Sequence, residues 1–232
     1  MAYRLLRPLR RVLLTPLYSH SKTLVTHQPL SFSVHTSSYV TEMRQSAFEG
    51  NILRLLRNEI QYELDRSPPL QPVPEFNSFS IDERPGEQWI WLNKNFGENE
   101  EIKVEVTTFD GSVPVKKTSN LTTEEDVMLH ITLIVDILKG EKVLEFICSA
   151  WPDSIEIQKV FVRGHDKMAG QSYIGPGFKE LDDELQDSLY KFLEARGVND
   201  DLAVFVHEFM KNKDKTEYIR WMGTVKSFME KK

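Results

Sequence analysis

The sequence of 232 residues predicts an α+β fold, in which one antiparallel sheet lies between helical segments. Apolar residues recur every three or four positions near both ends of the chain, whereas between residues 76 and 164 they recur every second position. The period-two segments lie close together in the sequence. This favours an antiparallel meander, because parallel neighbours need crossovers of a dozen residues or more.

The first 41 residues differ in composition from the rest. They contain no acidic residue, they are rich in serine and threonine, and Arg4, Arg7 and Arg11 share one helical face. Such a start is typical of an organelle transit peptide, for a mitochondrion rather than a plastid, with cleavage expected within residues 30–42. Pro8 would kink the helix, and a disordered basic tail on a cytosolic protein is the alternative. A secretory signal is not expected, since such a signal needs an apolar core of about 7–15 residues and the longest clean apolar run is Val12–Leu14.

Residues 42–232 are expected to form a single domain that opens with a helix over residues 42–66. Its apolar positions recur at helical spacing: Ile52, Leu55, Leu56, Ile60 and Leu64. The prolines of residues 67–75 predict an extended connector, because proline removes an N–H donor and disfavours helix before it.

Six strands are predicted next: Phe76–Ile81, Gln88–Asn95, Glu101–Phe109, Val127–Leu138, Lys142–Ala150 and Ile155–Arg163. The second has apolar residues on both faces, so we expect both to be covered. A long loop is expected over residues 110–125. A slip in the apolar phase between Ile157 and Val160 indicates a bulge in the last strand.

Three helices are predicted in the C-terminal part. The first covers Phe178–Arg196 and ends at Gly197, the second is capped by Asn199, and the third covers residues 215–230.

Three segments of this part resemble a known family: Tyr173–Gln186 (YIGPGFKELDDELQ), Phe192–Asn199 (FLEARGVN) and Glu217–Met222 (EYIRWM). They resemble the mitochondrial acidic matrix protein family, also called the mitochondrial glycoprotein family, which includes the receptor for the globular heads of complement component q. The resemblance spans roughly residues 42–232.

The resemblance implies a strongly twisted antiparallel sheet of about seven strands, flanked by N- and C-terminal helices, with three copies closing into a doughnut-like homotrimer. It also implies a matrix protein that supports oxidative phosphorylation and the mitochondrial ribosome without enzyme activity. It carries over no catalytic residue and no cofactor.

The charge distribution indicates which partners such a protein would bind. Residues 42–232 hold 35 acidic against 24 basic residues, a net charge of −11, or about −33 for a ring of three. Such a field attracts basic proteins, for example ribosomal or respiratory assembly clients, and repels nucleic acid. We expect the acidic partner-binding surface to include Glu124, Glu125, Asp126, Glu180, Asp182, Asp183, Glu184, Asp187, Asp200 and Asp201.

Other kinds of site are weakly signalled. The three histidines after residue 42 have no metal-ligand spacing, and Cys148 follows the apolar phase of its strand, as a small buried side chain would. Two alternatives stay open. One is a structural ring that buffers divalent cations, and the other is a hydrolase that combines a carboxylate with His165 or His207. No run of apolar residues reaches the length of a membrane-spanning helix.

Overall fold

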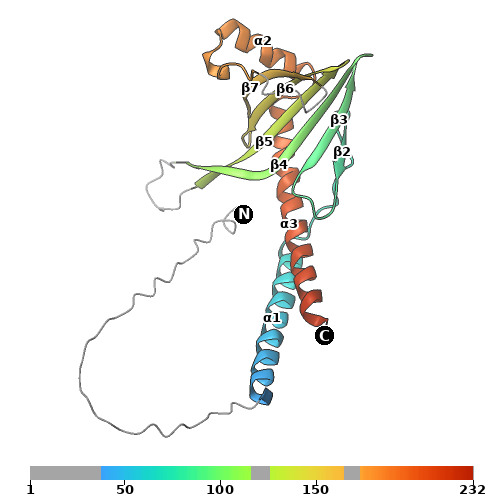
Figure 1. The fold of residues 1–232 in the computed structure, drawn as a ribbon, viewed down its shortest axis with the longest axis vertical. Coiled ribbons are helices and arrows are strands. Elements are labelled where there is room, and N and C mark those ends of the chain that lie inside the picture. The colour runs from blue at the N-terminus through green and yellow to red at the C-terminus, as the bar shows by residue number, and fades with distance from the viewer. Residues whose placement is uncertain (1–37, 116–125, 165–172, 232) are drawn as a thin grey trace, which may run out of the picture. The chain divides into compact units, whose positions relative to one another are not determined.

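The computed structural model describes residues 38–115, 126–164 and 173–231. It divides into two compact units, residues 1–52 and 53–232. Of the first unit, the described residues comprise only the beginning of α1 (Ser38–Arg66). The second unit holds the sheet and the other helices, and everything below concerns this unit (Figure 1).

A single antiparallel sheet of seven strands follows the chain order without a crossover. This confirms the predicted α+β architecture. The strands are β1 (Glu75–Phe76), β2 (Phe79–Glu83), β3 (Ile90–Phe96), β4 (Glu100–Val115), β5 (Asp126–Lys139), β6 (Lys142–Ala150) and β7 (Ile155–Gly164). Sequence neighbours pair throughout, as expected of a meander.

One face of the sheet carries the hydrophobic core. Val104 of β4 and Val135 of β5 are fully buried, as the period-two pattern predicts. They belong to one cluster with Val206 and Met210 of α3 (Asp200–Glu230), which passes behind the strands in Figure 1. Burying a side chain of this size stabilises the fold by about 1.5–3 kcal/mol, which explains why α3 stays on the sheet.

The opposite face is only partly covered, which corrects one prediction. Ile90 and Leu92 of β3 are buried under α3, but Trp91 is half-buried and Trp89 is 41% exposed.

Two predicted boundaries in the sheet are wrong. The expected strand Phe76–Ile81 is a hairpin, because Asn77 and Ser78 adopt positive φ angles of 45° and 68° and reverse the chain between β1 and β2. The expected loop over residues 110–125 is strand up to Val115, since β4 continues beside β5 past register shifts between Val106 and Gly111. Residues 116–125 lie outside the described part.

The bulge predicted in β7 is present. Ile147 of β6 pairs with Lys159, and Cys148 pairs with Ile157, so Gln158 is left without a partner in the ladder.

The start of α3 after the predicted cap Asn199 is confirmed, but the helix predicted to begin at Phe178 begins later, and the two helices predicted after it are one. A short 3₁₀ turn, η2 (Phe178–Glu180), precedes α2 (Asp183–Glu194), and Gly197 with φ of 84° turns the chain toward α3. The second and third predicted helices are one continuous helix, α3. No glycine or proline interrupts the polar run Lys211–Lys215, so nothing ends the helix there.

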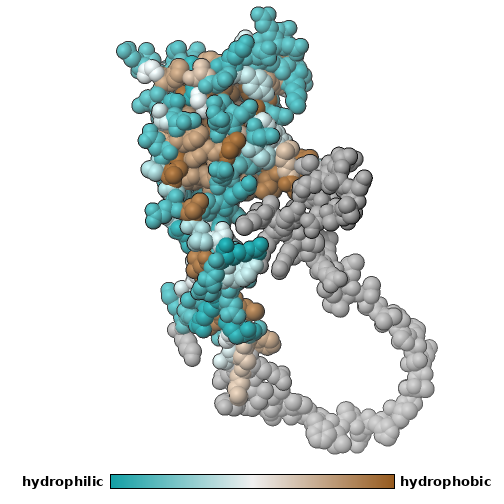
Figure 2. Space-filling view, turned by 180° about the vertical axis from the view of Figure 1, so that it is seen from behind, coloured by the Kyte–Doolittle hydropathy of each residue, from teal (hydrophilic) through white to brown (hydrophobic). Residues whose placement is uncertain are grey.

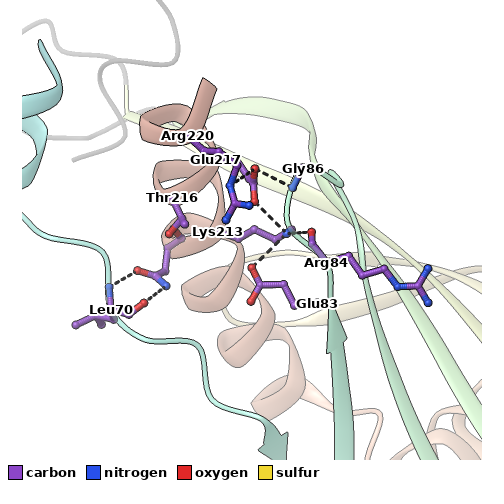
Figure 3. A network of polar contacts seen from close by, with 9 residues as sticks. Leu70, Glu83, Arg84, Gly86, Lys213, Thr216, Glu217 and Arg220 are labelled. Atoms are coloured by element: carbon purple, nitrogen blue, oxygen red, sulfur yellow. Dashed lines mark hydrogen bonds and ion pairs between the residues drawn. The ribbon is translucent and has the colours of Figure 1, made fainter. Parts of the chain in front are cut away.

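A polar cluster on α3 holds two distant segments, and we call it the α3 clamp (Figure 3). Its centre is Lys213, whose side chain is 1% exposed and whose Nζ lies 3.2 Å from Glu83 Oε1 and 3.8 Å from Glu217 Oε1. Glu217 also accepts a 3.0 Å hydrogen bond from the Gly86 N–H. The clamp thereby fixes the turn between β2 and β3 to the helix.

The same clamp holds the proline-rich connector in its extended form. The side-chain amide of Asn212 accepts from the N–H of Leu70 at 2.7 Å and donates to its carbonyl at 2.8 Å. The Lys213 Nζ also donates to the Arg84 carbonyl at 3.1 Å. Backbone groups of the connector and of the turn are thus bound by side chains of one helix.

Candidate functional site: an acidic edge

Apart from Asp126, the predicted acidic residues that the structure describes lie around the starts of α2 and α3. Asp182 is the N-cap of α2, and its carboxylate accepts a 3.0 Å hydrogen bond from the Glu184 N–H. Asp183 and Glu184 follow in the first turn, where the helix dipole favours anionic side chains. Local helix chemistry therefore explains why so many acids gather here.

Four carboxylates of this region point to solvent: Glu180, Asp183, Glu184 and Asp187. Within the described parts of the chain, none of the four forms an ion pair with a lysine or arginine. The surface around α2 is correspondingly almost all hydrophilic at the top of Figure 2.

The start of α3 has one structural and one exposed acid. Asn199 caps the helix by accepting from the Leu202 N–H, and Asp200 accepts a 3.0 Å hydrogen bond from the Ile155 N–H of β7. Asp201 is exposed and makes no such bond within the described residues. Asp200 therefore joins the helix to the sheet, whereas Asp201 is available to a partner.

Helix α2, the η2 turn before it and the start of α3 contact β7, the last strand of the sheet. Besides the bond to Asp200, β7 donates its Ile157 N–H to the Tyr190 hydroxyl of α2 at 3.2 Å. Lys179 of η2 lies 4.0 Å from Glu156 of β7. The helices thus cover backbone donors that an edge strand would otherwise leave unpaired. We call this surface the acidic edge: Glu156, Glu180, Asp183, Glu184, Asp187, Asp200 and Asp201.

Other acids are engaged inside the fold. Glu100, which lies at the start of β4, receives two hydrogen bonds from the buried Arg196, at 2.7 and 3.0 Å. The hydrogen bond from Arg196 lowers the pKa of Glu100 more than burial raises it. The Arg196 guanidinium also lies 3.5 Å from the ring centre of Phe192. This acid is neutralised and does not contribute to the field outside.

A second internal cluster lies on the half-covered face of the sheet. Arg163 of β7 forms ion pairs with Asp136 of β5 and Glu145 of β6. Burial raises the pKa of Asp136 despite the nearby arginine. Asp136 and Glu145 are opposite each other on β5 and β6, and Arg163 reaches both from β7, so the pairs tie three strands together rather than supply a free anionic surface.

Some predicted site residues cannot be placed on this surface. Glu124 and Glu125 lie outside the described residues, and Asp126 is placed only by its backbone at the start of β5. Sequence reasoning missed Glu156 because its neighbours along the chain are strand residues, and only the folding of η2 against β7 brings it to the edge.

The residues considered for catalysis or metal binding lie elsewhere. His207 is 2% exposed, and its Nε2 lies 3.0 Å from the Ala150 carbonyl; burial lowers its pKa. His165 lies outside the described residues. Cys148 is buried, as expected, and burial raises its pKa to about 12. In the parts of the chain that are described, no three His, Cys, Asp or Glu side chains are placed to share a metal ion. Those parts also contain no helix long and apolar enough to cross a membrane.

Comparison with known proteins places these features in a wider group. Residues 56–229 match the MAM33 family, described as mitochondrial glycoprotein. The chain is 31% identical over 206 residues to an uncharacterized mitochondrial protein of Arabidopsis thaliana, covering 83% of this chain and 80% of the relative. It is 26% identical over 234 residues to the mitochondrial acidic protein mam33 of Schizosaccharomyces pombe, covering 87% and 85%.

Two solved structures share the fold. The p22 protein of Trypanosoma brucei superposes with a TM-score of 0.65 at 27% identity, over 79% of this chain and all of that one. A Leishmania major protein, described as a sequence homologue of human p32, superposes with a TM-score of 0.62 at 22% identity, over 78% and 99%.

Proposed function

The chain belongs to the mitochondrial glycoprotein family, and on that premise we propose that it is a non-enzymatic acidic binding protein of the mitochondrial matrix. In this role it holds basic proteins by many weak charge contacts and so supports oxidative phosphorylation and mitochondrial translation. Residues 1–41 serve as the transit peptide, and residues 42–232 form the mature domain. Its relatives in Arabidopsis thaliana and Schizosaccharomyces pombe are mitochondrial by name, which supports this location.

One observation carries the proposal: the acidic edge keeps several carboxylates at solvent without a cationic partner in the described residues. Charges that are already paired, such as Glu100 with Arg196, exert little electrostatic force on an approaching partner protein. Exposed unpaired charges of one sign raise the local concentration of oppositely charged partners and speed their association. Assembly into a homotrimer would repeat this surface three times and add avidity.

The test compares the acidic edge with an equal loss of charge elsewhere. The edge variant carries Glu180→Gln, Asp183→Asn and Asp187→Asn. The control variant replaces three exposed glutamates outside the acidic edge, in the turns between β3 and β4 and between β5 and β6 and in β4: Glu98→Gln, Glu141→Gln and Glu101→Gln. The mature protein is immobilised, and bound basic proteins of a matrix extract are measured from 0.05 to about 0.5 M salt.

We expect wild-type binding to fall steeply with salt, and the edge variant to lose most of it at low salt. The control should retain more than half, although its net charge is the same. Binding that survives the full salt series would contradict an electrostatic mode. Equal losses in both variants would show that net charge alone matters and would reject the acidic edge.

Assembly and targeting are tested separately. Light scattering of residues 42–232 should give three times the monomer mass, and a monomer mass would reject the trimer. The N-terminus of the protein recovered from mitochondria should fall within residues 30–42, and an intact Met1 would reject cleavage of a transit peptide.

A further inference from the structure

A groove that shares only Asp201 with the acidic edge is formed by the first hairpin of the sheet and the beginning of α3. It has a volume of about 380 Å³ and is lined by Phe76, Asn77, Asp201, Val204, Phe205 and Glu208. We propose that this groove, which we call the hairpin groove, binds a short basic segment of a partner protein that carries an apolar side chain beside an arginine or lysine. The inference rests on the proposed function and adds a specific subsite to it.

The floor of the groove is apolar and firmly held. The rings of Phe76 and Phe205 stack with their centres 4.0 Å apart and only 11° from parallel. Val204 beside them is 42% exposed, although it lies on a helix whose opposite face is buried in the core. An apolar side chain placed here would remove this surface from water, which is favourable in proportion to the area covered.

The rim of the groove is anionic. Asp201 and Glu208 are seven residues apart on α3, so they lie on the same side of the helix about 10 Å apart, with Val204 and Phe205 between them. Both are exposed, and in the described part of the chain neither has a lysine or arginine within ion-pair distance. A cation is therefore the side chain that complements both ends of the groove.

The groove is formed in advance rather than created by a ligand. Asn77 is held in its left-handed conformation by the turn, and its carbonyl accepts a 3.3 Å hydrogen bond from the Lys94 Nζ. The α3 wall is fixed by the Asn199 cap and by the bond between Asp200 and Ile155. A site with little to reorganise loses less conformational entropy on binding.

The distance between the carboxylates of Asp201 and Glu208 predicts the order of residues in the bound segment. An arginine on either side of an apolar residue could reach Asp201 and Glu208 while the apolar residue covers Val204. A nucleic acid is disfavoured by two carboxylates. A purely charged tail would satisfy the rim but would leave the aromatic floor in water.

The experiment uses two fluorescent dodecapeptides with the same number of arginines. One has leucines between the arginines, and the other has glycines in their place. Affinities are measured by anisotropy with the full mature chain, its Val204→Asn and Glu208→Gln variants, and a matched control, Leu185→Asn. Leu185 is 47% exposed on α2, so it resembles Val204 in exposure but lies outside the groove.

We expect wild-type protein to bind the leucine peptide about tenfold more tightly than the glycine peptide. Val204→Asn should remove most of that preference and leave the glycine peptide unchanged. Glu208→Gln should weaken the leucine peptide about three- to tenfold, and Leu185→Asn should change neither peptide. Circular dichroism confirms that the variants are folded.

Three results would overturn the inference. If both peptides bind equally and Val204→Asn has no effect, the groove is not a subsite, although salt-dependent binding would leave the proposed function intact. If neither peptide binds, both proposals fail. If Val204→Asn changes the oligomeric mass, the occupant of the groove is a second copy of this chain.

Discussion

The acidic edge and the α3 clamp are built from the same kinds of charged residue but differ in what surrounds them. At the edge, Asp183 and Asp187 face water and have no ion partner in the described residues. In the clamp, Lys213 is almost fully buried between Glu83 and Glu217. Exposed charges contribute little to stability but act at a distance, whereas buried charges are screened from partners and are costly to separate.

Removal of the buried cation should have the largest effect. Lys213→Met leaves Glu83 and Glu217 without their positive partner, so we expect a loss of about 3–5 kcal/mol in the free energy of unfolding. The exposed neighbour Lys211 provides the control, since Lys211→Met should change stability by less than about 0.5 kcal/mol. Urea denaturation measures both. If both variants lose a similarly small amount of stability, the α3 clamp does not secure the turn between β2 and β3.

Loss of the ion pair between Arg196 and Glu100 should cause the second-largest decrease in the free energy of unfolding. Arg196→Ala should cost about 3 kcal/mol, because it leaves Glu100 with only the more distant Lys139 as a cationic partner and exposes the ring of Phe192. A double-mutant cycle with Glu100→Gln measures the coupling between the two side chains. A coupling energy near zero would contradict this assignment.

The ion pair between Arg196 and Glu100 should also make the free energy of unfolding depend on pH in the acid range. The pKa of Glu100 is lowered in the folded protein from its ordinary value of 4.5. The contribution of the pair is therefore complete above pH 4.5 and is lost as the pH falls through the lowered pKa. Denaturation at pH 3 to 6 should show that Glu100→Gln removes part of the acid sensitivity. An unchanged profile would argue against the pair.

His207 should make a smaller contribution to the pH dependence of stability, at pH values closer to neutral. Burial lowers its pKa from the ordinary 6.5, so the unfolded chain takes up the proton first. Stability should be complete above pH 6.5 and fall below it until the lowered pKa is passed. His207→Gln should flatten this part of the curve, measured by urea denaturation between pH 5 and 8. A wild-type curve that stays level across this interval would contradict the assignment.

The acidic edge should show the smallest change in stability and the largest change in binding. Combined Glu180→Gln, Asp183→Asn and Asp187→Asn should alter the free energy of unfolding by less than about 1 kcal/mol, mainly through lost helix-dipole contacts. Thermal denaturation measures the change in stability, and the salt-series binding assay measures the change in binding of basic proteins. A large loss of stability would mean that these carboxylates act inside the fold.

The features that follow from local chemistry could be predicted from the sequence. Alternation of apolar residues gave the strands around Val104 and Val135, and the Asn199 cap marked the start of α3. The first hairpin was missed, because Asn77 and Ser78 reverse the chain without a glycine.

Tertiary partners could not be predicted in this way. Lys213 lies in a run of polar residues that indicates a solvated surface, and its burial depends on Glu83, 130 residues earlier in the chain. The acids at the starts of α2 and α3 were identified as candidates, but Asp182 and Asp200 have structural partners that only the fold reveals. A residue type indicates the charge, whereas the fold decides whether that charge is free.

The unbroken course of α3 has a consequence for how this sequence can change. Over 31 residues the helix extends about 46 Å, and each residue turns it by about 100°. One inserted residue between Asp201 and Lys213 would swing the lysine away from Glu83 while Asp201 stayed in place. Insertions and deletions should therefore be tolerated at turns such as Gly140. Within the first half of α3 they should not be, because there the helix sets the orientation of Lys213 relative to Asp201.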